Sequence, residues 1–244
     1  MLDYVTRGLH LIPGSPLDEY HQLRYKLYIE QEGWDVPHID GREYDQFDTP
    51  ATVYLIKRRP ETGEVMGGMR LIPTTQPYLA EHVWPDLIQT RPIPKDPKVW
   101  EGTRMSAAPE LSVDERRQTL GELGAAFAEF LIGVGANRVI FEMPPKLLEF
   151  QSRNNPEFVE MLGEPITLDD GTLGIEVKRV TTPIFNRAVT GGCARFHEDL
   201  DESCMERITP VLRCTAPFYI MHLCLFFNHN KGVFDLPHFF CIHA

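Results

Sequence analysis

The chain has 244 residues, a length that suits one large α/β domain with an appended segment. Its 43% hydrophobic and 24% charged residues are typical of soluble globular proteins and exclude disorder, collagen and coiled coil as descriptions of the whole chain. The 24 Lys and Arg residues against 35 Asp and Glu residues give a formal charge of −11, which repels phosphate backbones and anionic lipid. We therefore expect no nucleic-acid partner.

The distribution of apolar residues and cysteines points to the cytoplasm. No apolar run reaches the roughly 18 residues that a membrane-spanning helix needs, and the apolar stretch near residue 10 is too short for a signal peptide. The five cysteines include no C-x-x-C pair and all lie at or after Cys193. A disulfide framework would leave everything before Cys193 without a crosslink, so we expect reduced thiols. These features predict a cytoplasmic protein without a membrane span.

The first predicted helix runs over 17–31. Ser15 supplies an N-cap, Pro16 occupies the first helical position and an acid follows at Asp18. The apolar residues at helical spacing, which mark the buried face, are Tyr20, Leu23, Leu27 and Tyr28. Arg24 shares this face, and burial of its guanidinium is unfavourable unless carboxylates or a ligand pair with it. The helix alone is equally compatible with an arginine at the edge of the stripe whose head reaches water.

An acidic segment with turn residues over 33–48 predicts a loop. Two β-rich runs follow, over 52–59 and 64–72, and the turn-forming link between them predicts an antiparallel hairpin. Gly67 and Gly68 in the second run indicate a bulge, a ligand close to the backbone, or a tight packing contact.

The rest of the first 190 residues reads as α/β. Six prolines within 73–97 predict a long surface connection with a short helix around 80–88. A strand over 98–107, a helix over 120–134 and a buried strand over 138–143 then alternate in a crossover pattern.

The composition changes after about Gly191, because this segment holds all five cysteines and five of the nine histidines. No two of these residues fall at zinc-finger or zinc-ribbon spacing, so no metal site is expected. Residues 191–244 are predicted to be a Cys/His-rich extension of unknown role: a packed extension, a dimer contact or a weakly structured end. Residues 1–190 are predicted to form the domain.

Charged residues and a tryptophan are spread over the predicted helix, the acidic loop and two strands: Arg24, Trp34, Asp45, Asp48, Arg70, Glu101 and Arg104. Buried arginines and carboxylates reduce each other's burial penalty, so we expect one paired polar cluster, which would suit a zwitterionic ligand. Strand alternation places Glu101 and Thr103 on one face and Arg104 on the other. Glu101 and Arg104 then reach one ligand only through a bulge at Gly102 or at a sheet edge.

Several blocks resemble, in order and spacing, the acyl-homoserine-lactone synthases (LuxI-type autoinducer synthases), which share the fold of the GNAT acyltransferases. The blocks are RYKLY at 24–28, Trp34, EYDQFD at 43–48, GGMRLIPTTQP at 67–77 and WEGTR at 100–104. The resemblance covers about 5–186 and is strong up to Arg104. Tyr28 and Thr103 stand where the family usually has phenylalanine and serine, and the looser match over 138–155 leaves the acyl group open.

The resemblance implies an α/β (α+β) fold, a GNAT-like three-layer α-β-α sandwich with a central mixed sheet. It implies acyl transfer from an acyl carrier protein or acyl-CoA thioester to the amine of S-adenosylmethionine (SAM), then lactonisation that releases methylthioadenosine. The product would be a quorum-sensing signal. SAM is a substrate in this reaction, and no cofactor is implied.

The implied chemistry assigns roles to the matching residues. The SAM amine must lose a proton before it attacks the thioester, and Glu101 is the candidate base. The implied catalytic residues are Glu101, Arg104 and Arg70. The implied SAM-binding residues are Arg24, Tyr28, Trp34, Asp45 and Asp48. The residues expected to line an apolar acyl pocket beside the helix over 120–134, although core packing also explains each of them, are Met105, Phe127, Phe141, Met143 and Leu147.

Three alternatives stay open. The first is a GNAT-type N-acyltransferase that uses acyl-CoA and an amine other than SAM. The segment QTLGEL at 118–123 resembles the pyrophosphate-binding Q/R-x-x-G-x-G/A segment at a helix N-terminus but lacks its last small residue, which counts against this function. The second is a non-catalytic SAM or metabolite sensor, against which Glu101 and the three arginines argue. The third is a synthase whose altered segment over 191–244 impairs folding.

Overall fold

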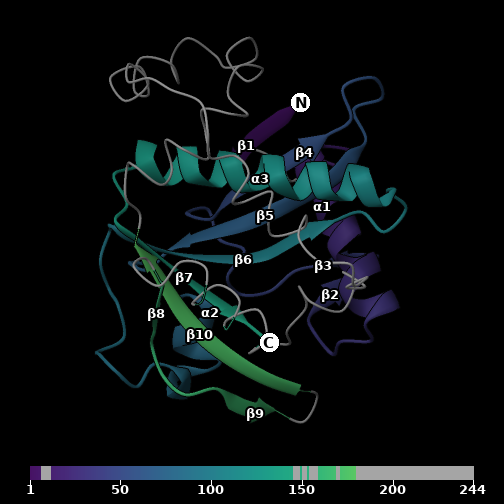
Figure 1. Ribbon diagram of the computed structural model, residues 1–244. Helices are drawn as coiled ribbons and strands as arrows, with labels where there is room; N and C mark the ends of the chain where they lie inside the picture. The colour runs from purple at the N-terminus through teal and green to yellow at the C-terminus, as the bar shows by residue number, and fades with distance from the viewer. Residues whose placement is uncertain (7–11, 145–148, 150–152, 154–158, 169–170, 180–244) are drawn as a thin grey trace.

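The computed structural model describes residues 1–6, 12–144, 149, 153, 159–168 and 171–179 (Figure 1). Its centre is an eight-stranded sheet. The spatial order is β1 (Leu2–Thr6), β4 (Val53–Arg58), β5 (Val65–Pro73), β6 (Val99–Ala107), β7 (Arg138–Met143), β10 (Gly171–Arg179) and β8 (Val159–Met161), with β9 (Ile166–Leu168) paired to β10. Among these described strands, β6 and β7 form the one parallel pair. The sheet is therefore mixed, as predicted.

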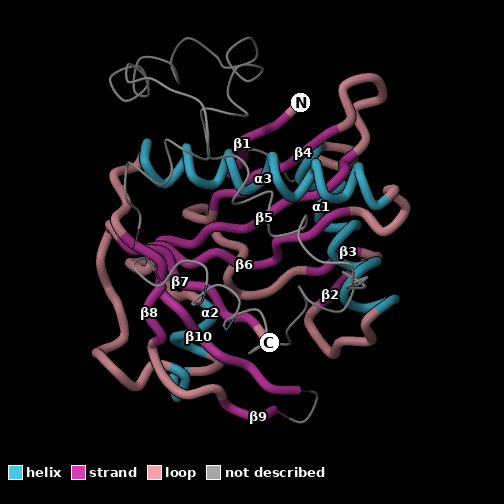
Figure 2. The backbone as a smooth tube through the Cα atoms, in the orientation of Figure 1, coloured by secondary structure: helices cyan, strands magenta, loops and turns pink. Residues whose placement is uncertain are grey.

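Helices cover both faces of this sheet (Figure 2). The helix α3 (Val113–Gly133) packs Leu123 and Phe127 against Leu55 of β4. The helix α1 (Pro16–Tyr25) packs against Tyr54 and Ile56, which neighbour Leu55 and so point to the opposite face. A short helix, α2 (Leu79–His82), and a 3₁₀ turn (Pro85–Leu87) cover the same face of the sheet as α1. They pack against β5, β6 and β7. The predicted three-layer α-β-α sandwich is confirmed.

Most predicted elements are present, and the differences lie at their ends. The predicted first helix is α1 followed by a π-helical segment, Lys26–Gln31, and the Asp18 backbone N–H donates to the Ser15 hydroxyl as the N-cap predicts. The hairpin of β4 and β5 is confirmed. The strand β1 and the short pair β2 (His38–Ile39) and β3 (Arg42–Glu43) were not predicted.

The helix α3 begins earlier than predicted. It starts at Val113, where Ser112 and Glu115 form a reciprocal capping box. The segment at 118–123 therefore lies inside α3, where its backbone N–H groups bond within the helix and are not free for a pyrophosphate. The expected position of that segment at a helix N-terminus is wrong. The extension predicted over 191–244, with its boundary at 190, and Leu147 lie outside the described residues.

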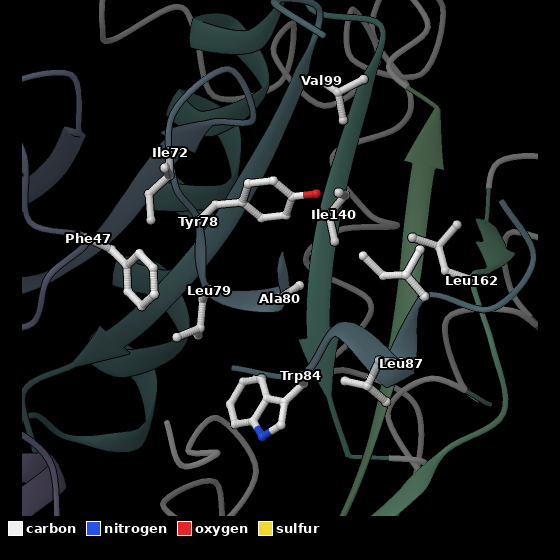
Figure 3. Close-up of a cluster of buried hydrophobic side chains, with 11 residues drawn as sticks. Phe47, Ile72, Tyr78, Leu79, Ala80, Trp84, Leu87, Val99, Ile140 and Leu162 are labelled. Atoms are coloured by element: carbon white, nitrogen blue, oxygen red, sulfur yellow. The ribbon is translucent and has the colours of Figure 1, made fainter. Parts of the chain in front are cut away.

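The strands β6 and β7 stop pairing before either strand ends. In the part of the chain that the structure describes, their ladder joins Val99–Glu101 to Arg138–Ile140 and goes no further, although β6 continues to Ala107 and β7 to Met143. On the α2 side of this junction lies an apolar cluster in which Tyr78 points between Val99 and Ile140 (Figure 3). The divergence places Glu101 at the point where the two strands separate.

Candidate functional site

A group of six paired charged side chains lies on the α1 face of the sheet. We call it the arginine–carboxylate cluster; its members are Arg24, Glu43, Asp45, Asp48, Arg70 and Arg104. They come from α1, β3, the loop after β3, β5 and β6. Three positive and three negative charges balance, as burial requires.

Arg24 lies at the centre of the cluster. Its side chain is fully buried, and its two terminal nitrogens donate to the two carboxylate oxygens of Asp48 at 2.9 and 3.1 Å. Its Nε donates to Glu43. The predicted pairing of a buried Arg24 with carboxylates is confirmed, and the alternative in which its head reaches water is wrong.

Asp48 is saturated with donors. Besides Arg24, it accepts hydrogen bonds from Arg70 at 3.2 Å, from the Tyr54 hydroxyl at 2.7 Å and from the backbone N–H of Asp45 at 2.9 Å. Burial would raise the pKa of Asp48, but the adjacent Arg24 and Arg70 guanidinium groups outweigh it and hold the pKa well below its usual range. This carboxylate is fully committed to organising the cluster.

Arg70 and Arg104 keep unused donors. Arg70 donates to Asp45 at 2.6 Å and to the Thr103 hydroxyl at 2.9 Å, while Arg104 donates to Glu43 at 3.1 Å and to Asp45 at 3.3 Å. Nη2 of Arg70 and Nε of Arg104 are buried and have no hydrogen-bond acceptor among the described residues. Two guanidinium N–H groups on adjacent strands offer charge-assisted hydrogen bonds to an anion such as a carboxylate.

A bulge in β6 turns Arg104 toward the cluster. Gly68 pairs with Ser106 and Arg70 with Thr103, so one residue of β5 opposes Arg104 and Met105 together. Arg104 adopts φ of +56°, a conformation that residues other than glycine rarely take. The bulge reverses the strand alternation, and Arg104 therefore shares contacts with Arg70 on one face.

The bulge expected at Gly102 is displaced by two residues. Gly102 pairs in regular register with Leu71. A Cβ at this position would lie 2.5 Å from Cε1 of Phe141 and 2.7 Å from Cε of Met69, so close packing explains this glycine. As predicted, a bulge brings Arg104 to the face of the sheet that carries Glu101. The bulge lies at Arg104 and not at Gly102.

Glu43 belongs to the cluster and was not predicted as a site residue. It bridges Arg24 and Arg104. Burial would raise its pKa, but these two guanidinium groups lower it to about 2. The turn at Asp40 and Gly41, both with positive φ, pairs β2 with β3 and places Glu43 beneath α1. The Asp-Gly sequence is a hairpin signal that predicts this turn.

Glu101 lies outside the ion pairs of the cluster. Its two carboxylate oxygens accept the backbone N–H groups of Leu79 at 2.9 Å and Ala80 at 2.8 Å, at the start of α2. No ion pair joins Glu101 to an arginine within the described residues. The sequence predicted Glu101 as the third carboxylate of the cluster, and this prediction is wrong, because Glu43 takes that place. Burial raises the pKa of Glu101, although the two N–H donors oppose this.

Tyr28 and Trp34 form an aromatic support for Arg104. Their rings stack with centroids 4.7 Å apart and planes 8° from parallel. The Arg104 guanidinium carbon lies 5.4 Å from the Tyr28 ring centroid and 5.9 Å from that of Trp34. Contacts of the guanidinium with these two rings therefore help to hold the Arg104 head in place.

Of the residues expected to line the acyl pocket, four lie on the α3 side, and Leu147 lies outside the described residues. Met105 and Phe141 pack against a buried cluster that contains Phe127. The centroids of the Phe127 and Phe141 rings are 5.5 Å apart. Met143 is buried and, two residues from Phe141, falls on the same face of β7. Glu101 thus stands on one face and these apolar side chains on the other, at the point where β6 and β7 separate.

Comparison with known proteins decides the family. Residues 9–134 match the family described as autoinducer synthase. The chain belongs to this family. An isovaleryl-homoserine lactone synthase of Bradyrhizobium diazoefficiens is 36% identical over 125 residues, which are 50% of this chain and 54% of that protein. An acyl-homoserine-lactone synthase of Ralstonia nicotianae is 43% identical over 86 residues, 34% of this chain and 42% of that protein. The chain spans about half the length of these curated relatives.

Two solved structures share the fold. The CoA-dependent acyl-homoserine lactone synthase BjaI with SAM and isopentyl-CoA has a TM-score of 0.66 and 27% identity, over 78% of this chain and 88% of that one. TofI in a ternary complex with an inhibitor and MTA has a TM-score of 0.61 and 25% identity, over 84% of this chain and 99% of that one. Within the described residues, no helix is both long and apolar enough to cross a membrane.

Proposed function

We propose that this autoinducer synthase is an acyl-homoserine-lactone synthase. It transfers an acyl group from a thioester of CoA or acyl carrier protein to the amine of SAM and then closes the lactone. The observation that carries this proposal is the pair of unused N–H donors on Arg70 and Arg104, beside the carboxylate of Asp45, whose side chain is only 3% exposed. Such a site complements the amino-acid end of SAM, which has a carboxylate and an ammonium on one carbon.

The cluster divides into ligand-binding and supporting residues. Arg70 Nη2 and Arg104 Nε are assigned to the SAM carboxylate, and Asp45 to the ammonium. Arg24 and Asp48 are fully buried and satisfy each other, so they position these groups and do not touch the ligand. Beyond the cluster, Trp34, braced on Tyr28, is the candidate to stack on the adenine or meet the sulfonium.

The first chemical step is acyl transfer. Glu101 accepts a proton from the SAM ammonium, directly or through water, and the freed amine attacks the thioester carbon. A C–N bond forms, the C–S bond to the carrier breaks, and the carrier leaves as a thiol after taking up a proton. Backbone N–H groups near Gly102–Arg104, where β6 has left β7, are the candidates to stabilise the oxyanion.

The second step is lactonisation. A carboxylate oxygen of the acylated SAM attacks the carbon bonded to the sulfonium, a C–O bond forms and the C–S bond breaks. The electron pair of that bond neutralises the sulfur, and methylthioadenosine leaves without a proton transfer. The reaction requires chiefly that the carboxylate be oriented, which the paired donors of Arg70 and Arg104 do.

The donor thioester enters where β6 and β7 separate, and its acyl chain lies among Met105, Phe127, Phe141 and Met143. The CoA dependence of the similar synthase BjaI supports acyl-CoA as donor. The charge of −11 also opposes docking of an acidic carrier protein. The cytoplasmic location stays a prediction from the sequence.

A product assay tests the proposal. The purified protein is incubated with isotope-labelled SAM and a panel of acyl-CoAs and acyl carrier proteins, and methylthioadenosine and labelled lactone are followed by mass spectrometry. Formation of both products supports the synthase and identifies the donor. Consumption of acyl-CoA only with another amine, with SAM unchanged, would replace it with the N-acyltransferase alternative. As control, Glu101→Gln lowers kcat by roughly 10²-fold or more while SAM binding persists.

A further inference from the structure

A second carboxyl group, that of Glu142, lies beside Glu101 and has no role in the function proposed above. In the parallel ladder Glu101 pairs with Ile140, so Glu142, two residues further along β7, points to the same face as Glu101. The two carboxyl groups are within hydrogen-bonding contact of each other. They meet where β6 and β7 separate.

The donors around the pair fix its total charge. Both oxygens of Glu101 accept backbone N–H groups, from Leu79 and Ala80. No lysine or arginine forms an ion pair with Glu142 among the described residues, and its Oε1 is buried without a hydrogen-bond partner there. Glu101 is fully buried and Oε1 of Glu142 is buried beside it, so the two carboxyl groups cannot both ionise without a compensating cation, and the pair retains one proton.

The same contacts decide which residue carries that proton. Backbone N–H groups stabilise an ionised carboxylate, and they point at Glu101 alone. Glu142 is then the protonated partner, whose O–H is directed at a Glu101 oxygen. Burial, and after it the charge of Glu101, raises the pKa of Glu142 well above its usual range, which agrees with this assignment.

Resting on the proposed function, we propose that Glu142 is a positioning residue that, in its protonated form, donates a hydrogen bond to Glu101 and keeps Glu101 ionised as the proton acceptor for the SAM amine. The other charged or titratable groups near the pair are Arg70 on β5 and Tyr78, which precedes α2; Glu81 within α2 acts on Tyr78. The Tyr78 hydroxyl donates to the Pro94 carbonyl at 3.0 Å, and Glu81 pairs with Lys95. Arg70 is committed to the cluster and favours the ionised form of Glu101 from a distance.

Infrared spectroscopy tests the protonation state without any requirement for activity. At neutral pH the native protein should show the carbonyl absorption of a protonated carboxyl group, which shifts in D₂O and is absent from Glu142→Gln. The control Glu61→Gln, at an exposed position, should retain the absorption. A native spectrum without this absorption, or its persistence in Glu142→Gln, would overturn the proposal even if SAM turnover is confirmed.

The pH profile of kcat/KM then separates donation from charge repulsion. At low pH, kcat/KM falls as Glu101 becomes protonated, and we call this part of the profile the acid limb. Glu142→Gln keeps an N–H donor to Glu101, so the acid limb of this variant should lie at the same pH as in the native protein. Glu142→Leu removes the donor and should raise the pH of the acid limb by about one unit. At a given pH on that limb, kcat/KM should then be about tenfold lower than in the native protein. If the acid limb of Glu142→Gln moves to lower pH, Glu142 is ionised in the native protein. If Glu142→Leu has the native pH profile, Glu142 has no role in keeping Glu101 ionised. Either result contradicts the proposal.

Discussion

The Tyr20 hydroxyl donates a hydrogen bond of 2.6 Å to the backbone carbonyl of Arg104, 84 positions later in the chain. This bond ties α1 to the bulge in β6, where Arg104 has its unusual positive φ. The same helix carries Arg24 one turn later, which binds the carboxylates that Arg104 and Arg70 also contact. Docking of α1 therefore sets the positions of all three arginines.

Removal of this hydroxyl should loosen Arg104. Tyr20→Phe leaves a buried carbonyl without its donor, and we expect a loss of about 1–2 kcal/mol in the free energy of unfolding. We also expect weaker SAM binding, because Arg104 Nε is no longer held in place. Urea denaturation and calorimetric titration measure the two effects. A variant of native stability and native SAM affinity would show that the bond does not maintain the bulge.

Gly68 is predicted to be indispensable for the docking of Tyr20. A Cβ at Gly68 would lie 2.5 Å from Cε2 of Tyr20, a fully buried ring, so Gly68→Ala should displace the ring and cost about 1–3 kcal/mol. Gly133 is the matched control, since nothing lies within 4 Å of a Cβ built there. Thermal unfolding of the two variants checks the difference. Equal stabilities for both would refute the tight fit.

Asp45 and Asp48 should respond differently to loss of charge. Asp48→Asn removes an acceptor for two buried arginines, and we expect a loss of about 3–5 kcal/mol in the free energy of unfolding. Asp45 pairs with Arg70 and Arg104 but not with Arg24, so Asp45→Asn leaves the Arg24 pairs intact, should cost less stability and should act mainly on SAM affinity. Unfolding and binding measured on both variants test this division. A stable Asp48→Asn that fails to bind SAM would instead place Asp48 in contact with the ligand.

Two pH windows of stability follow from His21 and Glu43. Burial and the charge of Arg24 lower the pKa of His21 to about 4 from 6.5, so the unfolded chain takes up this proton first and stability falls as the pH drops from 6.5 to 4. Glu43 has a pKa of about 2 against an ordinary 4.5, so its contribution is present above pH 4.5 and is lost between 4.5 and 2. Each shift corresponds to about 3 kcal/mol.

His21→Asn separates the two windows. We compare the free energy of unfolding of the native protein with that of this variant at a series of pH values. The difference between the two should change with pH between 6.5 and 4 and should change little below pH 4. The lower window should remain in both proteins because Glu43 is unchanged. A difference curve that is flat between pH 6.5 and 4 would mean that His21 is not neutral in the fold.

Much of the site was predictable because its parts have local signals. The helical stripe places Arg24 beside Tyr20, and burial of a guanidinium requires carboxylates, which the structure provides. The hairpin of β4 and β5 follows from two β-rich runs with a turn between them. The capping box at Ser112 is also a local signal, and it sets the true start of α3.

The remainder depends on contacts between distant segments. The bulge at Arg104 arises from a register shift against β5 and from the Tyr20 hydroxyl, neither of which the WEGTR segment itself specifies. Glu101 binds the N–H groups of α2 because the chain over 73–97 folds back onto the sheet. The pairing of Glu142 with Glu101 requires the parallel register of β6 and β7. Strand periodicity alone fixes none of these.

Calorimetric comparison of SAM with methylthioadenosine tests most directly whether the arginine–carboxylate cluster reads the amino-acid end of SAM. Methylthioadenosine lacks the carboxylate and the ammonium, so the native protein should bind SAM about tenfold more tightly or better, as expected for charge-assisted hydrogen bonds. Arg70→Lys keeps the charge but loses the second guanidinium donor, and the preference should shrink. Equal affinities of the native protein for the two ligands would contradict the assignment of Arg70 and Arg104 to the carboxylate.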